Sequence, residues 1–217
     1  MLFWLCYIFD KDIALRTGQL PIISNEYCDL TLPDNYMDCY DYLPKLDKDM
    51  NAFSFGADSL VPHMPGDPRL SILKDKTSRL LYSNQAAQTS DAEMLRIIRE
   101  LDEELEAWRL SIPSAFRPAL SILNRPQISL LGMGHLHSMR HITLQLEYHY
   151  LMTYIHGATA RCHGPKREED SQVRDWTIGI RSSMALSLEA SRSTLVYLRT
   201  AVHSLAGEAF CYRYMHL

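Results

Sequence analysis

The sequence predicts an all-α protein, an irregular multi-helix array of about five main helices with a long proline-rich segment between the first two. Apolar residues recur at steps of three and four along five stretches, and no stretch shows the sustained alternation of a β-strand. Prolines and glycines cluster within residues 34–68, which we expect to form an irregular connection inside one domain spanning 1–217. Apolar residues make up 47% of the chain and charged residues 22%, ordinary values for a globular protein.

The first helix is predicted at the start of the chain. Gly18 followed by Pro21 is a typical helix stop, because glycine accepts the left-handed cap conformation and proline cannot continue the helix. Asp12 and Arg16 lie one turn apart and are expected to pair on the polar side of this helix. The residues expected to form its buried stripe are Leu2, Leu5, Cys6, Phe9 and Ile13.

Two further helices are predicted after the proline-rich segment. One runs from Arg69 to Gln88, with helical spacing of its leucines. The next begins at Ser90, which with Glu93 forms a capping-box pattern, and is ended by Pro113. Its expected buried stripe is Met94, Ile98, Leu101, Leu105 and Trp108.

The last two helices differ in pattern. Residues from about Leu136 to Ile155 are apolar on nearly all sides, which favours a central buried helix, and the segment Ser114–Gly134 before it is expected to be a loop or hinge. A long helix follows a charged turn near residues 166–170. Its expected stripe is Ile180, Met184, Leu188, Ser191, Leu195, Leu198, Val202 and Leu205.

Charge and cysteine usage exclude several classes of protein. The net charge of −4 argues against a nucleic-acid surface, and the short basic run of Lys74, Lys76 and Arg79 is expected to be a solvated face. No segment is long and apolar enough to suggest a membrane span. The cysteines are odd in number, widely spaced and without a C-x-x-C pair, so we expect a reducing compartment and buried, unpaired thiols. They stand at positions 6, 28, 39, 162 and 211.

Several segments carry a family resemblance. The run from Phe3 to Gly18, FWLCYIFDKDIALRTG, resembles the Trp-containing signature helix of the fungal-specific transcription factor domain, the middle homology region of zinc-cluster regulators. Pro21 and the run DLTLP at 29–33 match the turn and the acidic extended stretch that follow in that family, although Gln19 and Leu20 stand where Arg and Pro are usual. Two later stretches resemble later parts of the family's domain more loosely. They are LDEELEAWR at 101–109 and the segment 141–154, which is rich in Tyr and His.

The resemblance implies a nuclear regulatory domain that controls RNA polymerase II transcription and is not an enzyme. DNA contact would come from a six-cysteine zinc cluster that this chain cannot build, so no cofactor is expected in the chain itself and no direct contact with nucleic acid or membrane. Expected partners are proteins of the transcription machinery or a dimer partner, together with a small-molecule effector. Because the signature helix lies well inside the domain in that family, we expect an N-terminally truncated domain whose first helix exposes apolar surface.

Three groups of residues are candidates for chemistry. His137 and His141 lie one helical turn apart, a spacing that lets two imidazoles share a metal, so the alternative function is a metal-dependent helical enzyme that uses them. Core or surface roles are favoured, because the pattern is not H-E-x-x-H; no catalytic or metal residue is therefore predicted. Acidic pairs within Glu100, Glu103, Glu104 and Glu106 are read as a solvated face. An effector pocket could be lined by Tyr148, Tyr150, Tyr154 and Trp176, although plain core packing is favoured for each.

Overall fold

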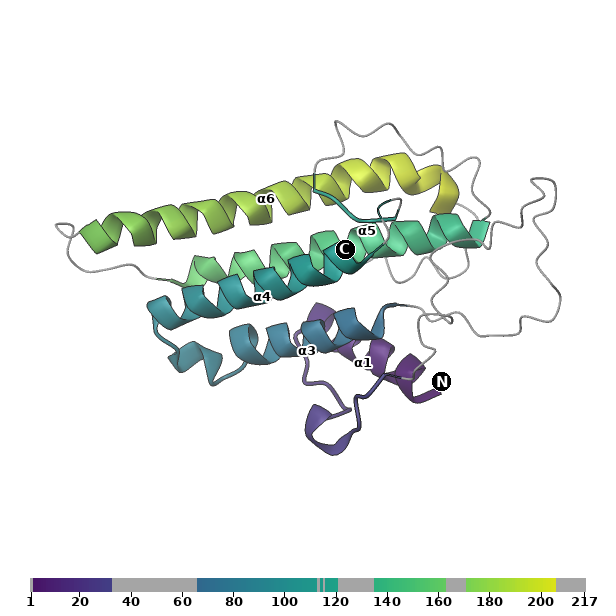
Figure 1. Cartoon of the computed structure of the whole chain (residues 1–217), viewed down its shortest axis with the longest axis horizontal. Helices are drawn as coiled ribbons and strands as arrows, with labels where there is room; N and C mark the ends of the chain where they lie inside the picture. The colour runs from purple at the N-terminus through teal and green to yellow at the C-terminus, as the bar shows by residue number, and fades with distance from the viewer. Residues whose placement is uncertain are drawn as a thin grey trace. The chain divides into compact units, whose positions relative to one another are not determined.

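The structure is a computed structural model of the 217-residue chain, and it describes residues 2–32, 66–112, 114, 116–120, 135–162 and 171–205. Within these residues all regular structure is helical, which confirms the predicted all-α class (Figure 1). The α-helices are α1 (Leu2–Thr17), α3 (Pro68–Tyr82), α4 (Asp91–Ser111), α5 (His135–Gly157) and α6 (Ser171–Leu205). Short 3-10 turns are η1 (Asn25–Tyr27), η2 (Ala86–Gln88) and η4 (Ala158–Arg161).

The chain divides into two compact units, Met1–Lys76 and Thr77–Leu217. Helix α1, the turn η1 and most of α3 belong to the first unit. The end of α3 and the helices α4, α5 and α6 belong to the second. Most of the predicted irregular segment, residues 34–65, lies outside the described residues. Its last residue, Pro68, is instead the first residue of α3, a position where the missing N–H of proline costs no hydrogen bond.

Helix α1 ends as predicted but buries the opposite face. Gly18 adopts φ +68°, the left-handed cap conformation. The expected buried stripe is wrong: Leu2 is 72% exposed and Ile13 58%. Because α1 is apolar on nearly all sides, periodicity could not select its inner face. The expected exposure of apolar surface on this helix is confirmed. Its buried residues are Trp4, Tyr7, Ile8, Lys11, Asp12, Ala14 and Leu15.

The capping signal predicted for α4 is confirmed, whereas α3 ends earlier than predicted. The helix expected to reach Gln88 ends at Tyr82, and the chain continues through a bend and the turn η2. The Ser90 side chain caps α4 by accepting a hydrogen bond of 3.3 Å from the Glu93 N–H, while the Glu93 carboxylate pairs with Arg96. Helix α4 ends at Ser111, before the predicted stop at Pro113. The predicted stripe of α4 is confirmed, since Met94, Ile98, Leu101, Leu105 and Trp108 are all buried.

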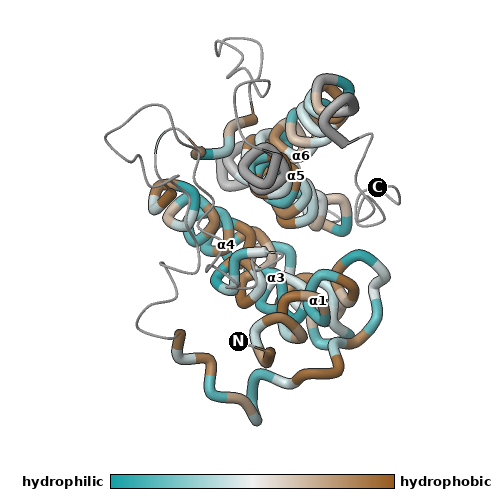
Figure 2. Tube along the Cα trace, turned by 90° about the vertical axis from the view of Figure 1, so that its right-hand side faces the viewer, coloured by the Kyte–Doolittle hydropathy of each residue, from teal (hydrophilic) through white to brown (hydrophobic). Residues whose placement is uncertain are grey.

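In the second unit α5 lies between α4 and α6, as both ribbon views show (Figures 1 and 2). The central, buried position predicted for α5 is confirmed for its described side chains from residue 141 onward. The stripe predicted for α6 is wrong at Met184, Leu188 and Leu195, which are more than half exposed. Leu198 does pack on the core, and the side chains of Val202 and Leu205 lie outside the described residues. Helix α6 instead packs its small and hydroxyl side chains inward, which lets two helix backbones approach closely. Its buried residues are Ser183, Ala190, Ser193, Tyr197 and Ala201.

The described cysteines are unpaired and less buried than expected. Cys6 is exposed on α1, while Cys28 and Cys162 are half-buried, so the expectation of buried thiols is wrong for Cys6. Cys39 and Cys211 lie outside the described residues. Among the helices described, none combines the length and the apolar character needed to span a lipid bilayer.

Candidate functional site

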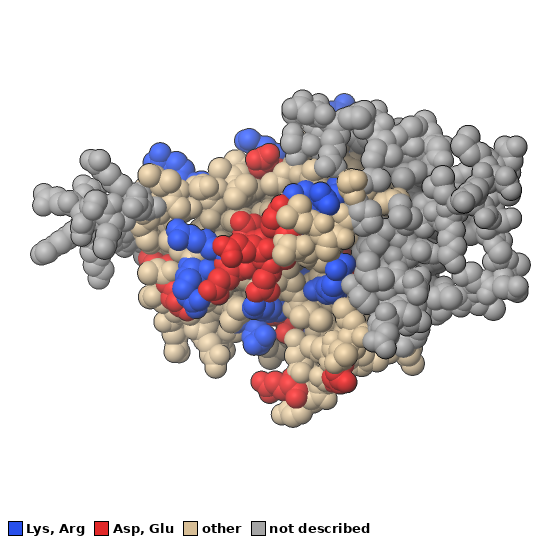
Figure 3. Space-filling view, viewed as in Figure 1, with Lys and Arg blue, Asp and Glu red and all other residues tan. Residues whose placement is uncertain are grey.

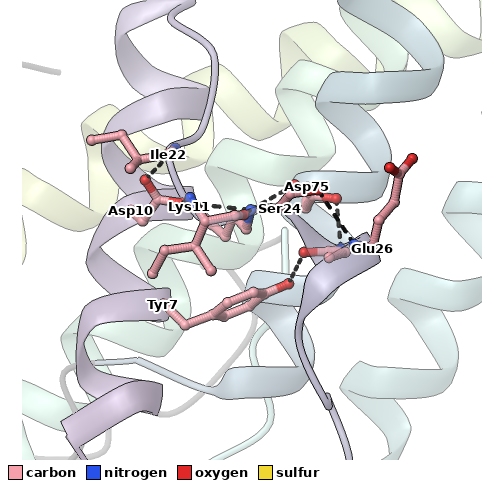
Figure 4. Close-up of polar contacts among 9 residues, drawn as sticks. Tyr7, Asp10, Lys11, Ile22, Ser24, Glu26 and Asp75 are labelled. Carbon is pink, nitrogen blue, oxygen red and sulfur yellow. Dashed lines mark hydrogen bonds and ion pairs between the residues drawn. The ribbon is translucent and has the colours of Figure 1, made fainter.

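The segment that carries the family resemblance contributes to a buried group of charges, which we call the ionic cluster. Figure 4 shows three of its members, Asp10, Lys11 and Asp75. Lys11 Nζ on α1 lies 2.9 Å from Asp75 Oδ1 on α3, and Lys74 Nζ on α3 lies 2.9 Å from Asp12 Oδ1 on α1. Both lysine side chains are fully buried. The two helices are therefore joined by a reciprocal pair of ion pairs, each using one residue from each helix. The cluster comprises Asp10, Lys11, Asp12, Arg16, Lys74 and Asp75.

The ionic cluster also holds the segment that follows α1. The Asp10 carboxylate accepts hydrogen bonds from the N–H groups of Ile22, at 2.8 Å, and Ile23, at 3.1 Å. Lys11 donates to the Ile23 carbonyl. The side chain of one residue thus satisfies two successive backbone donors, and the chain after Gly18 folds back along α1. This explains why a turn and an extended stretch follow the helix stop.

Neutral polar groups close the cluster on one side. The Tyr7 hydroxyl donates to Asn25 Oδ1 at 2.8 Å, and Asn25 Nδ2 donates to Asp75 Oδ2 at 2.7 Å. Burial and the nearby Asp75 carboxylate raise the pKa of the Tyr7 hydroxyl, so it stays a donor at neutral pH. A chain of hydrogen bonds therefore runs from α1 through η1 to α3.

The chemistry of the ionic cluster is that of a structural, not a catalytic, group of charges. Asp12 also pairs with Arg16 at 3.2 Å, which confirms the predicted pairing but places it at the buried side of α1. A lysine becomes a nucleophile when burial leaves its amine without a compensating charge, and here each buried ammonium faces a carboxylate. The expectation that Lys74 is solvated is wrong, because its side chain is fully buried against Asp12. Pairing across 62 positions of sequence is a tertiary property that local charge spacing does not show.

A second polar group, the carbonyl strap, joins α5 to the segment 116–120 in the second unit. Gln145 Nε2 donates to the Ala119 carbonyl at 2.5 Å and lies 2.7 Å from His149 Nε2, which is itself 2.9 Å from the same oxygen and can donate to it in the tautomer with Nε2 protonated. With Nε2 protonated, His149 Nδ1 is a buried acceptor with no hydrogen-bond partner. Burial lowers the pKa of His149, which keeps the imidazole neutral. Ser193 on α6 donates to the Leu120 carbonyl and so holds the same segment from the other side.

Three helices of the second unit meet at His156. Its Nδ1 lies 3.2 Å from Ser183 Oγ on α6, and its Nε2 lies 3.3 Å from Asp102 Oδ1 on α4, within ion-pair distance but without hydrogen-bond alignment. The order Asp, His, Ser matches the members of a hydrolase triad. However, Ser183 is buried in the middle of α6, so its backbone N–H is committed to the helix and supplies no oxyanion donor. We interpret the three residues as a link between helices.

The proposed metal pair of His137 and His141 is only partly described. The side chains of His135 and His137 lie outside the described residues, while His141 is buried with its ring 6.2 Å from Phe116 and 6.4 Å from Tyr197. His149 faces Ala119 in the carbonyl strap. In the described parts of the chain, no group of three or more His, Cys, Asp or Glu side chains is arranged to hold a metal ion.

The tyrosines proposed to line an effector pocket pack against one another. Tyr154 stacks on Tyr150 with ring centres 5.7 Å apart, and Tyr82 from the end of α3 lies 4.1 Å from Tyr154 and donates to its carbonyl. Tyr148 is buried, and burial raises its pKa to about 12. Trp176 is half-buried on α6. Core packing is therefore confirmed for Tyr148, whereas Tyr150 and Tyr154 are half-buried like Trp176, and the effector pocket stays a prediction.

The acidic residues of α4 gather on one face of the molecule (Figure 3). Glu100, Glu103 and Glu104 are exposed, as expected of a solvated face. Glu106 is half-buried and pairs with Arg109 at 2.6 Å, and this bond lowers the pKa of its carboxyl. A general acid at neutral pH needs a raised pKa, whereas the pKa of Glu106 is lowered. Glu106 is therefore unsuited to that role.

Comparison with known proteins points to one class. The chain is 33% identical over 158 residues to an ABC-transporter-regulating transcription factor of Aspergillus fumigatus, covering 71% of this chain and 15% of that protein. The chain is similar to fungal transcription regulators. A protein of the same description from Aspergillus oryzae is 32% identical over 156 residues, with the same coverage. An uncharacterized transcriptional regulatory protein of Schizosaccharomyces pombe is 29% identical over 116 residues, which is 54% of this chain and 16% of that protein.

The chain therefore spans about 15% of the length of the two Aspergillus relatives that it matches. No family model matches the chain, and no solved structure is significantly similar to it. The reciprocal ion pairs of Lys11 with Asp75 and Lys74 with Asp12 were missed by sequence reasoning. The adjacent opposite charges at 11–12 and 74–75 were the available signal, because two such dipeptides on facing helices can pair reciprocally.

Proposed function

We propose that this chain is the regulatory and interaction region of a fungal zinc-cluster transcription factor that controls RNA polymerase II transcription in the nucleus. The observation that carries the proposal is the similarity, over 71% of the chain, to two proteins described as transcription factors. The signature-like segment 3–18 agrees with it. The net charge of −4 agrees with a region that contacts proteins instead of DNA.

The DNA contact in this proposal is made by a binuclear zinc cluster that needs six cysteines. The chain has five cysteines at long separations, so the cluster is not built from these residues. The names of the two Aspergillus relatives further support a proposal about target genes. We infer that the genes controlled are those of ABC transporters, the class of protein named in the two Aspergillus descriptions.

The ionic cluster supports the proposal in one respect. The residues that resemble the family signature are the same residues that pair with α3 and hold the following segment. In the proposed role, this segment is the structural centre of the first unit, and partner contacts are made by exposed surfaces elsewhere. Loss of the cluster should therefore abolish regulation by unfolding the first unit.

A transcription reporter tests the proposal. The 217-residue chain is fused to a heterologous DNA-binding domain in a yeast strain that carries the matching reporter gene. We expect reporter output to change relative to the DNA-binding domain alone, and the Lys11→Met variant to lose this change. Glu103→Gln, at an exposed position of α4, is the matched control and should keep it. Immunoblots must show equal amounts of each fusion.

Three results would count against the proposal. An unchanged reporter output at normal fusion levels would remove the regulatory role. Sequence-specific binding of duplex DNA by the isolated chain, measured at physiological salt, would show that the chain reads DNA itself. A fluorescent fusion that stays outside the nucleus when expressed as part of the full-length protein would contradict the proposed location.

A further inference from the structure

Helix α6 has two faces of opposite character. The inner face packs small side chains on α5, with Ala190 and Ala201 fully buried. The outer face carries the large apolar side chains. The most exposed of them is Leu195, at 69%. Both ribbon views show α6 at the edge of the second unit, with α5 on one side of it (Figures 1 and 2). The apolar side of α6 therefore faces away from the core that α6 helps to form.

Arginines are interleaved with these apolar residues on one line of the helix. The steps along the line are 3, 4, 4, 3 and 4, so its members share one side of α6. Every member is exposed, and no described carboxylate is within ion-pair distance of the three arginines. We call this line the α6 outer stripe. It comprises Arg181, Met184, Leu188, Arg192, Leu195 and Arg199.

We propose that the α6 outer stripe docks an acidic amphipathic helix of a partner protein. Steps of three and four present ridges into which the side chains of another helix fit. The three arginines call for carboxylates beside the apolar seam of that helix, because Arg binds a carboxylate through two parallel hydrogen bonds. The proposal deepens the interaction role proposed above and rests on it for its biological setting.

Charge selects this occupant over two others. A second copy of α6 laid along the stripe would bring arginines against arginines, and Glu189 is the only exposed carboxylate among the described side chains of α6, 176–199 and 201. A membrane surface would need a continuous apolar face that can enter the lipid. Here an arginine interrupts the apolar residues between Leu188 and Leu195, which matches a helix partner with alternating apolar and acidic positions.

A binding measurement with synthetic peptides tests the proposal. The probe is a helical peptide of about 20 residues, long enough to hold a helix, with leucines at helical spacing flanked by glutamates. Its twin carries lysine at each glutamate position. Fluorescence anisotropy with the whole 217-residue chain should show binding of the glutamate peptide, weakened by salt, and binding of the lysine peptide at least about tenfold weaker.

Variants of the chain locate the site. Replacing Leu188 and Leu195 with Gln, or the three arginines with Gln, should each weaken binding of the glutamate peptide at least about tenfold. These side chains are exposed, so the variants should keep the circular dichroism spectrum of the parent. Leu110→Gln is the matched control, since Leu110 is an apolar residue 50% exposed on α4, and it should bind as the parent does.

The remaining outcomes overturn the proposal. Equal binding of both peptides would remove charge complementarity. A dimer in sedimentation that dissociates in the Leu188→Gln, Leu195→Gln variant would make a second copy the occupant. Binding to vesicles containing phosphatidylserine, lost in the same variant while no peptide binds, would make it a lipid surface. Because these measurements involve no reporter, their failure is distinct from failure of the proposed transcriptional role.

Discussion

The α1–α3 pair in the first unit and the α5–α6 pair in the second both bury polar groups, but they do so in different ways. Between α1 and α3 the buried groups are charged and meet as Lys11 with Asp75 and Lys74 with Asp12. Between α5 and α6 the polar contacts join hydroxyls and carbonyls, as from Ser187 to the Thr153 carbonyl, and alanines such as Ala190 are buried on α6. The α1–α3 pair depends on the matching of opposite charges, and the α5–α6 pair on the close approach of the two helices.

This difference determines what each interface tolerates. A buried ion pair gains little over an apolar pair of equal volume, but removal of one partner leaves a buried charge and costs much more. A contact built on small residues loses little when a hydroxyl is removed, but cannot accept added volume. The first interface should therefore fail when a charge is removed, and the second when a side chain is enlarged.

The largest effect is expected from Lys11→Met in the ionic cluster. Methionine keeps the length of the side chain and leaves the Asp75 carboxylate buried without its ammonium partner. We expect the free energy of unfolding of the first unit to fall by about 3–5 kcal/mol. Urea titration with fluorine NMR of fluorotryptophan measures this, because Trp4 lies in the first unit and Trp108 in the second.

The double variant Lys11→Met, Asp75→Leu is the control for charge. It removes both members of the pair, so a large part of the lost stability should return. If the single variant lost less than about 1 kcal/mol, in the range of a solvent-exposed pair, the buried character of the cluster would be contradicted.

The second interface should respond to added volume. Ala190 is fully buried against α5, so Ala190→Leu should cost about 1–3 kcal/mol by overpacking. Ala185 is exposed on the same helix, and Ala185→Leu serves as the control with little expected change. The Trp108 signal in the same urea titration reports on this unit. Equal stability of the two variants would show that α6 does not pack on α5 through Ala190.

These two interfaces also separate what the sequence predicts from what it does not. The ends of helices were predicted correctly at Gly18 and Ser90, because a left-handed cap and a side-chain cap are properties of a few neighbouring residues. The buried stripe of α4 was correct for a similar reason, since its charged residues leave only one apolar side. Helix existence and class are therefore local properties of this chain.

The buried faces of α1 and α6 were predicted wrongly for a physical reason. Hydrophobic periodicity assumes that the largest apolar residues face the core, whereas α6 buries alanine and serine and exposes Leu188 and Leu195. Helix α1 is apolar on nearly all sides, and its inner face is selected by ion pairs with α3. The identity of a partner more than sixty positions away cannot be read from the spacing of Lys74 among its neighbours.

Acid should weaken the second unit through His149 in the carbonyl strap. Burial lowers the pKa of this imidazole in the folded chain below its ordinary value near 6.5. The unfolded chain therefore binds more protons below that pH, and stability should fall as the pH is lowered from about 6.5 toward the folded pKa. Thermal unfolding between about pH 7.5 and 5 measures this effect.

The variant His149→Gln isolates that contribution from the other histidines. Glutamine can still donate to the Ala119 carbonyl but does not titrate, so the variant should lose less stability on acidification than the parent. Parallel pH profiles for parent and variant would contradict the role assigned to His149.

The smallest effects are expected at two glycines, and they should have opposite signs. Gly18 holds φ +68°, where an L-residue is strained, so Gly18→Ala should cost the first unit about 1–2 kcal/mol although no atom would clash with the added methyl. Gly179 lies inside α6, and a methyl there would meet the Arg99 Nη2 atom at 3.5 Å, an ordinary contact. Gly179→Ala should therefore stabilise the second unit by about 0.5–1 kcal/mol. The Trp4 and Trp108 signals separate the two changes, and a gain in both variants would mean that the cap at Gly18 is not left-handed.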